Sequence, residues 1–197
     1  SSSEHLLSLV GSLLDYHKLE AHKMDLHPVS FNPDELLHTI AQSFLPMAGK
    51  KGLELQCETS PETRRTYTGD AFRIRQIVDN LLSNALKFTQ QGHILLRAKM
   101  HGRLLCITVR DTGCGMTAEE QQMIFKEFPR LSSAQGEEGV GLGLSITLKL
   151  VQLLQGEIHL ESTPGKGSSF LITLPLQPTQ NNQAPAEDSL VPLESPE

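Results

Sequence analysis

The stretch of sequence that decides the fold is DAFRIRQIVDNLLSNALKFT, residues 70–89. Asp70 is a typical helix N-cap, and the apolar residues after it recur every three or four positions, which predicts a helix to about residue 88. One side of this helix is apolar and comprises Ile74, Ile77, Val78, Leu81, Leu82 and Ala85. The other side carries, within roughly 80° of arc, Gln76, Asn80, Asn84 and Lys87. One face therefore packs, and the other is offered to solvent or to a ligand.

The polar side of this helix has two interpretations. Asn80 and Asn84, one turn apart, present neutral amide oxygens that suit a hard cation such as Mg²⁺ with its own phosphate and water ligands. Lys87, one turn later, suits a phosphate. The same stripe is also explained as a solvated helix face, so both interpretations stay open.

On either side of this helix, the hydrophobic pattern predicts further helices and strands. The expected strands are 29–31, 53–57, 92–100, 103–111, 157–161 and 169–174, and the other expected helices are 1–24, 33–51, 118–125 and 142–154. A turn at His101-Gly102 joins two of the strands. Because there is no regular βαβ alternation, we expect an α/β (α+β) fold, a two-layer sandwich of mixed β-sheet covered on one face by helices.

The chain divides into three parts by composition. Residues 1–26 form a helix whose apolar stripe needs a partner helix, and residues 28–176 form the globular part. Residues 177–197 are rich in Pro, Gln, Asn, Ser and Glu, which is typical of a flexible tail or an interdomain linker.

Asp111 ends a predicted strand in phase with the apolar residues before it, so its carboxylate is expected to point toward the buried side. A buried carboxylate needs a hydrogen-bond donor. In the segment that continues to Met116, Gly113 and Gly115 let the backbone approach a flat ligand closely, so Asp111 could accept a hydrogen bond from an adenine amino group. An Asx-type turn explains the same Asp-x-Gly pattern, and the sequence does not separate the two.

A second glycine-rich segment, Gly139-Val140-Gly141-Leu142-Gly143-Leu144, leads into the helix 142–154. Its backbone amides can face an anion at the helix start, where the helix dipole is favourable. The segment is not a Walker P-loop, and it does not follow a strand as a dinucleotide fingerprint does. The polar residues 131–138 before it would suit a mobile lid.

Composition argues against several classes of protein. A net charge of -6 gives no basic surplus that would suggest nucleic acid as a partner. The three cysteines form no C-x-x-C pair, so neither a disulfide framework nor a zinc site is indicated. No apolar run approaches the roughly 18 residues of a membrane span. The eight histidines lack spaced partners, so none is singled out as catalytic.

Taken in order, these segments resemble the catalytic and ATP-binding domain of sensor histidine kinases, within the superfamily shared with gyrase, Hsp90 and MutL. Residues 70–89 resemble the N box, 111–115 the G1 box, 124–128 the F box, 139–143 the G2 box and 164–168 the G3 segment. The match covers about residues 28–176, and residues 6–24 are similar to the second helix of the family's dimerisation and phosphotransfer hairpin. The resemblance implies the Bergerat ATP-binding fold, with ATP and Mg²⁺ as cofactors.

The resemblance also implies roles for individual residues. Asn84 becomes the Mg²⁺ ligand with Asn80 assisting, and Asp111 binds the adenine. Lys87 and Arg130 lie near the phosphates, and Ser168 supports the adenine side. Further nucleotide contacts are implied for Gly113, Gly115, Met116, Gly139, Gly141, Leu142, Gly143 and Leu144.

At the position of Asn80, hydrolytic members of the superfamily have a glutamate that activates water, and an amide cannot act as that base. The resemblance therefore implies phosphoryl transfer to a histidine and on to a receiver-domain aspartate. The family's phosphoacceptor histidine lies in a His-Glu-hydrophobic-Arg-like segment that this chain lacks, so no phosphoacceptor is expected here. The implied partners are the histidine-bearing hairpin of the same or a partner protomer and a response-regulator receiver domain. The implied setting is a homodimer in the cytoplasmic portion of a membrane-anchored sensor, of the hybrid type. A hydrolytic ATPase and an inactive nucleotide-binding module remain as alternatives.

Overall fold

The structure is a computed structural model that describes residues 24–124 and 142–179. The helix expected over residues 1–24 lies outside the described residues except for its last residue, Met24, which is not helical. The proposed lid, the F-box residues after Ile124 and most of the tail also lie outside them.

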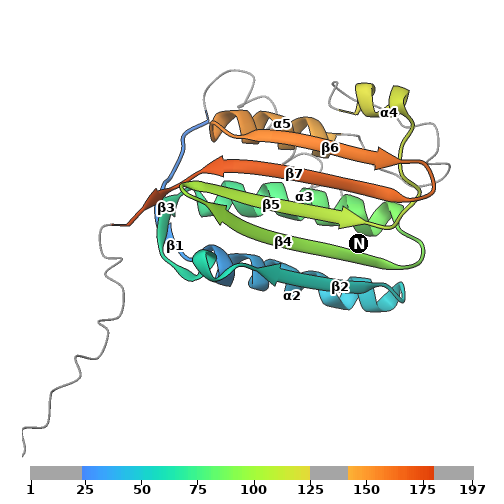
Figure 1. The fold of residues 1–197 in the computed structure, drawn as a ribbon, viewed down its shortest axis with the longest axis horizontal. Coiled ribbons are helices and arrows are strands. Elements are labelled where there is room, and N and C mark those ends of the chain that lie inside the picture. Colours follow the sequence, from blue (N-terminus) through green and yellow to red (C-terminus); the bar gives the residue numbers. More distant parts are fainter. Residues whose placement is uncertain (1–23, 125–141, 180–197) are drawn as a thin grey trace, which may run out of the picture.

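A five-stranded mixed sheet forms one layer of the domain (Figure 1). Its strands, in spatial order, are β2 (Glu54–Thr59), β4 (His93–His101), β5 (Leu104–Asp111), β7 (Gly167–Pro175) and β6 (Glu157–Thr163). β2 pairs with β4 in parallel, and the other neighbours are antiparallel. The expected mixed sheet is therefore confirmed.

Helices α2 (Pro33–Lys50), α3 (Ala71–Phe88) and α5 (Leu142–Leu153) cover one face of this sheet, and the short α4 (Ala118–Met123) lies at one end (Figure 1). Strand alternation puts every second side chain of β5 under the helices, and Leu105, Ile107 and Val109 are at most 1% exposed. The apolar side of α3 meets these strands, and all six of its predicted core residues are buried. This two-layer packing confirms the predicted fold class.

Side-chain caps fix where the helices begin. Asp70 is the N-cap of α3, as predicted, and its Oδ1 accepts a hydrogen bond from Arg73 N at 3.0 Å. Its Oδ2 accepts from His27 N at 2.8 Å, which ties the segment before the domain to the start of α3. Thr117 and Glu120 form a complete capping box on α4.

Several details differ from the prediction. The turn between β4 and β5 falls on Gly102-Arg103, one residue later than expected, and Gly102 has a φ of +62°. Gln177 and Pro178, assigned above to the tail, form strand β8 (Gln177–Pro178). β8 completes a small antiparallel sheet with β1 (Val29–Phe31) and β3 (Tyr67–Gly69). β1 matches the predicted strand 29–31, whereas β3 and β8 were not expected as strands. Their pairing joins segments far apart in the sequence, which no local pattern reveals. The 3-10 helix η1 (Pro61–Arg64) was not expected either.

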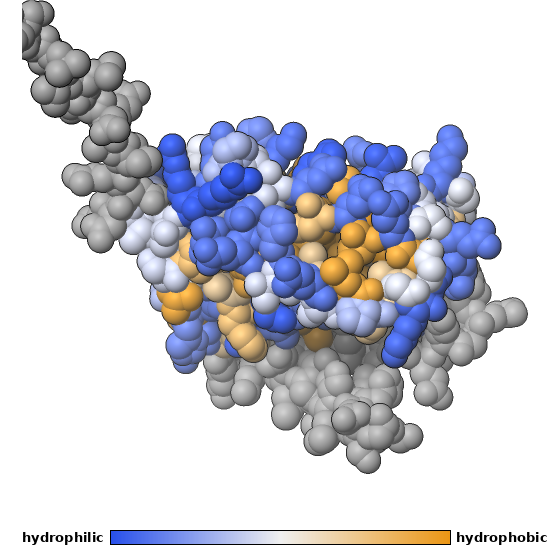
Figure 2. All heavy atoms as spheres, turned by 90° about the horizontal axis from the view of Figure 1, so that it is seen from below, coloured by the Kyte–Doolittle hydropathy of each residue, from blue (hydrophilic) through white to orange (hydrophobic). Residues whose placement is uncertain are grey.

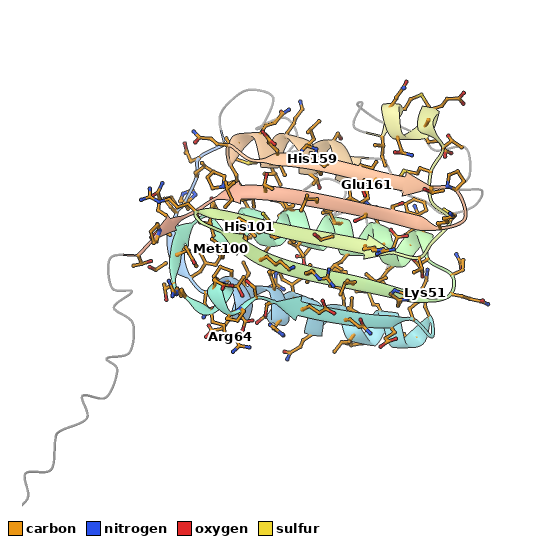
Figure 3. All side chains as sticks on the ribbon, in the orientation of Figure 1. Lys51, Arg64, Met100, His101, His159 and Glu161 are labelled. Atoms are coloured by element: carbon orange, nitrogen blue, oxygen red, sulfur yellow. The ribbon has the colours of Figure 1, made fainter. Side chains whose placement is uncertain are left out.

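The surface of the domain is mostly polar. Seen from the side of α2 and β2, it shows an apolar area among hydrophilic side chains (Figure 2). The exposed apolar residues of α2 are Leu45 and Met47, each 48% exposed. The sheet face away from the helices carries exposed polar residues, among them His101, His159 and Glu161 (Figure 3).

Lys51, labelled at the opposite end from His101 in Figure 3, donates from Nζ to the carbonyl oxygen of Leu86 at 2.8 Å. Since Leu86 lies in the last turn of α3, this bond holds the end of α2 to the end of α3.

Candidate functional site

One cavity gathers residues that the sequence places in four separate segments. Its volume is about 450 Å³ when the space open to solvent is counted. Its lining is Asn84, Ala85, Phe88, Asp111, Cys114, Gly115, Met116, Ile124, Leu144, Ser168 and Phe170. Most of this lining is apolar, and the polar groups are few. That composition is typical of a site for a largely flat, partly polar small molecule.

Two residues of the polar side of α3 face inward: Asn84 lines this cavity and Asn80 contacts α5, so this part of the side is not a solvated helix face. Asn84 is half-buried, lines the cavity, and makes no side-chain hydrogen bond with any described residue. Asn80 is also half-buried, and its Nδ2 donates to Gly143 O and to Thr147 Oγ1, both at 3.3 Å. Because a carbonyl oxygen can only accept, the nitrogen of this amide must face α5. The Oδ1 of Asn80 is left without a partner among the described residues.

Asp111 is only 6% exposed at the end of β5, which confirms that it points to the buried side. Its Oδ1 accepts a hydrogen bond from Gly113 N at 2.8 Å, which is the Asx-type turn considered above. Burial raises the pKa of Asp111, while backbone amides of Gly113 and Ser168 act against that rise. The Asx-type turn is therefore confirmed, and the carboxylate also lines the cavity, so the adenine interpretation stays a prediction.

The loop after Asp111 is wedged between the end of α3 and the turn between β6 and β7. A Cβ at Gly113 would lie 2.5 Å from the carbonyl oxygen of Phe88, and one at Gly115 would lie 2.0 Å from that of Thr163. Gly115 also has a φ of +65°, which favours glycine. Cys114 N donates to Phe88 O at 3.3 Å, and Gly165 N donates to Cys114 O at 2.7 Å. Only glycine fits this loop at both positions.

Ser162 and Gln121, which the sequence did not single out, hold residues of the cavity lining by hydrogen bonds. Ser162 Oγ accepts from Met116 N at 2.8 Å and lies 2.9 Å from Ser168 Oγ. Gln121 Nε2 donates to Met116 O at 3.1 Å and to Ser162 O at 3.0 Å. These bonds hold two lining residues, Met116 and Ser168. No motif or spacing marks Ser162 or Gln121, because their role depends on strands and loops that meet only in the folded chain.

The remaining predicted site residues lie around the cavity or outside the described residues. Lys87 does not line the cavity, and its Nζ lies 5.5 Å from the ring centroid of Phe88. Gly143 is in the first turn of α5, which Leu142 begins, and a Cβ there would meet no described atom within 4 Å. Arg130, Gly139 and Gly141 lie outside the described residues.

Five lining residues were not predicted as site residues: Ala85, Phe88, Cys114, Ile124 and Phe170. Strand alternation could have identified Phe170, which follows Ser168 on the same face of β7. Ala85 was assigned to the packed side of α3, and it is both buried and part of the cavity wall.

Within residues 24–124 and 142–179, no group of three or more His, Cys, Asp or Glu side chains is placed to hold a metal ion. Over the same ranges, no helix combines the length and the apolar character that crossing a bilayer requires.

Comparison with solved structures supports the fold. Full-length ShkA in complex with AMPPNP superposes with a TM-score of 0.82 at 32% identity, covering 90% of this chain and 37% of ShkA. The Acinetobacter baumannii histidine kinase AdeS gives a TM-score of 0.73 at 20% identity, covering 88% of this chain and 79% of AdeS, and shows the fold alone.

Sequence relatives are sensor proteins. The sensor histidine kinase RcsC of Escherichia coli (strain K12) is 36% identical over 192 residues, which cover 96% of this chain and 20% of RcsC. The sensor protein GacS of Pseudomonas syringae pv. syringae is 37% identical over 200 residues, covering 98% of this chain and 22% of GacS. This chain thus spans about a fifth of the length of these curated relatives. Residues 69–178, more than half of the chain, match the model of one family, so the chain belongs to the histidine kinase-, DNA gyrase B-, and HSP90-like ATPases.

Proposed function

We propose that this chain is the ATP-binding catalytic domain of a sensor histidine kinase, which donates the γ-phosphoryl group of ATP to a histidine outside the chain. One observation carries the proposal: the same cavity is lined by the buried carboxylate of Asp111 and by the side-chain amide of Asn84, which makes no hydrogen bond with any described residue. The first group suits a base with an amino group, and the second suits the metal-bound phosphates of the same nucleotide. The kinship with sensor kinases supports this pairing.

The adenine lies at the Asp111 end in this proposal. The carboxylate accepts a hydrogen bond from the exocyclic amino group, and Ser168 adds a polar contact beside it. Met116, Ile124 and Phe170 supply apolar surface for the flat ring. Gly113 and Gly115 keep the backbone of the loop close to the ligand, since a side chain at either position would not fit.

The phosphates lie toward Asn84, Asn80 and the start of α5. Asn84 supplies a Mg²⁺ ligand, and the fixed amide of Asn80 leaves its Oδ1 available to assist. Neutral amide oxygens fit a hard cation that arrives with phosphate and water ligands, and the bound Mg²⁺ would neutralise charge on the β- and γ-phosphates. Lys87, Arg130 and the segment with Gly139, Gly141, Leu142, Gly143 and Leu144 complete the phosphate side, as the resemblance implies.

The side chains of the described lining support transfer over hydrolysis. Asp111 is the one carboxylate in the described lining, and it is already bound to the amide of Gly113. Asn80 stands where a general base would be needed, and an amide cannot take a proton from water. A hydrolytic ATPase would require a base from elsewhere in the chain.

In the whole protein, we place this domain in the cytoplasmic portion of a membrane-anchored homodimeric sensor. Its acceptor is a hairpin bearing the phosphoacceptor histidine, from the same or the partner protomer, and a receiver-domain aspartate takes the phosphoryl group next.

The test uses the chain of residues 1–197 with labelled ATP and Mg²⁺, alone and with a supplied histidine-bearing hairpin. We expect binding, near-background hydrolysis, no acid-labile phosphate on the chain alone, and transfer to the hairpin. Asn84→Ala should abolish the transfer. ATP turnover that depends on Asn80 would instead establish the hydrolytic alternative, and binding without transfer would establish the inactive module. Acid-labile phosphate on the chain alone would contradict the absence of a phosphoacceptor.

A further inference from the structure

The hydroxyl of Ser162 has three polar neighbours and a single proton. Met116 N donates to its Oγ at 2.8 Å, the carbonyl oxygen of Gly167 lies at 3.0 Å, and Ser168 Oγ lies at 2.9 Å. A serine hydroxyl has one donor and two acceptor lone pairs. Since a carbonyl oxygen can only accept, the Ser162 proton belongs to Gly167 O.

This assignment decides the direction of the Ser162–Ser168 hydrogen bond. With the Ser162 proton on Gly167 O and one lone pair bound to Met116 N, the second lone pair must be filled by the proton of Ser168. The reverse direction would leave Ser162 Oγ and Gly167 O 3.0 Å apart without a proton between them. Two unscreened acceptors at that distance repel each other, so the first arrangement is favoured.

The direction of this bond sets what Ser168 can offer to a ligand. Ser168 is 8% exposed and lines the cavity together with Asp111. Because its proton is held by Ser162, its Oγ presents only lone pairs, and an ionised Asp111 also presents only lone pairs. The two polar groups at this end of the cavity are then both acceptors.

We propose that Ser162 is a positioning residue that turns the Ser168 hydroxyl into an acceptor, and that it thereby sets the preference of the site for a base carrying an exocyclic amino group. A keto oxygen in that place would face two acceptors and no donor. This inference rests on the proposed ATP site. Gln121 helps to fix this arrangement, because its hydrogen bonds to Met116 O and Ser162 O hold the backbone on both sides of the Ser162 hydroxyl.

The experiment compares the affinities of the chain for ATP and for inosine triphosphate, which carries a keto oxygen where adenine has its amino group. In Ser162→Ala the Ser168 proton is released and can turn toward the keto oxygen. We define the preference ratio as the dissociation constant for inosine triphosphate divided by that for ATP. In Ser162→Ala this ratio should fall by about three- to tenfold, mainly through tighter binding of inosine triphosphate. Ser162→Thr, which keeps the hydroxyl, should restore the wild-type ratio.

Ser168→Ala tests the acceptor independently, with Ser162 left in place. It should also lower the ratio, though less than Ser162→Ala does, because no donor replaces the lost acceptor. The double variant should match Ser168→Ala, since Ser162 acts only through Ser168.

A purely structural role of Ser162 would change both dissociation constants by the same factor. An unchanged ratio in Ser162→Ala, or in Ser168→Ala if the first variant does not fold, would overturn this inference and leave the ATP site intact. Failure of the wild-type chain to bind ATP would overturn the proposed function and this inference together.

Discussion

Replacing Gly115 or Gly143 by alanine should have opposite effects on the free energy of unfolding. Gly115 has a φ of +65°, where an L-residue costs about 1–2 kcal/mol. A new Cβ would also lie 2.0 Å from Thr163 O, a backbone atom that cannot swing aside, and such overpacking costs typically about 1–3 kcal/mol. We therefore expect Gly115→Ala to lower the free energy of unfolding by about 2–5 kcal/mol.

Gly143 differs because it lies in the first turn of α5 and no described atom lies within 4 Å of its Cβ position. Alanine in a helix is more stable than glycine by about 0.5–1 kcal/mol, so Gly143→Ala should leave stability equal or slightly higher. The open space is where we place the phosphates. A clash of about 1–3 kcal/mol with them would weaken ATP binding by about five- to a hundredfold.

Urea denaturation followed by far-ultraviolet circular dichroism measures the first effect, since the chain contains no tryptophan to report by fluorescence. Calorimetric titration with a non-hydrolysable ATP analogue measures the second. Wild-type stability in Gly115→Ala would refute the packing of the loop against β6. Wild-type ATP affinity in a folded Gly143→Ala chain would refute the placement of the phosphates at the start of α5.

Four further outcomes are expected. Lowering the pH through the raised pKa of Asp111 should weaken ATP binding, because a protonated carboxyl no longer offers two acceptors. Binding titrations at mildly acidic pH values should show this dependence for the wild type and not for Asp111→Asn. Without nucleotide, the stability of the fold should depend on pH in the opposite direction. Because the pKa of Asp111 is higher in the folded than in the unfolded state, its carboxyl contributes most to stability below the unfolded pKa, and this contribution is lost as pH rises through the folded pKa. Asp111→Asn should remove this trend from the urea midpoints. Asp70→Ala should cost about 0.5–2 kcal/mol of stability through the lost cap of α3, with Asp70→Asn as the matched control, and equal stability of the alanine variant would contradict that role. Arg97→Ala, which breaks a 2.7 Å ion pair with Glu58 on the sheet face, should cost less than about 1 kcal/mol because both side chains are about half exposed, and a larger loss would mean that the pair is better shielded than the structure shows.

Patterns of local origin were predictable from the sequence. The apolar side of α3, its cap at Asp70 and the inward direction of Asp111 each follow from a period of 3.6 or 2 residues, and the structure confirms them. The elements that were missed, η1, β3 and β8, are two to four residues long and show little periodicity, although the equally short β1 was predicted. Where a motif had two explanations, as at Asp111, only the folded surroundings showed that the carboxylate closes the turn and also lines a cavity.

The sequence by itself determined helices α2 to α5, the main strands, the fold class and, through the order of its motifs, the relationship to sensor histidine kinases. These properties depend on the spacing of residues within one segment or on the order of the segments, and both are contained in the sequence. Only the tertiary structure decided that the amide of Asn80 is held by α5 and that Ser162, Met116 and Ser168 form one hydrogen-bonded chain. Such partners lie as many as 67 residues apart, and the direction of a hydroxyl proton depends on every acceptor around it, so no local pattern contains that information.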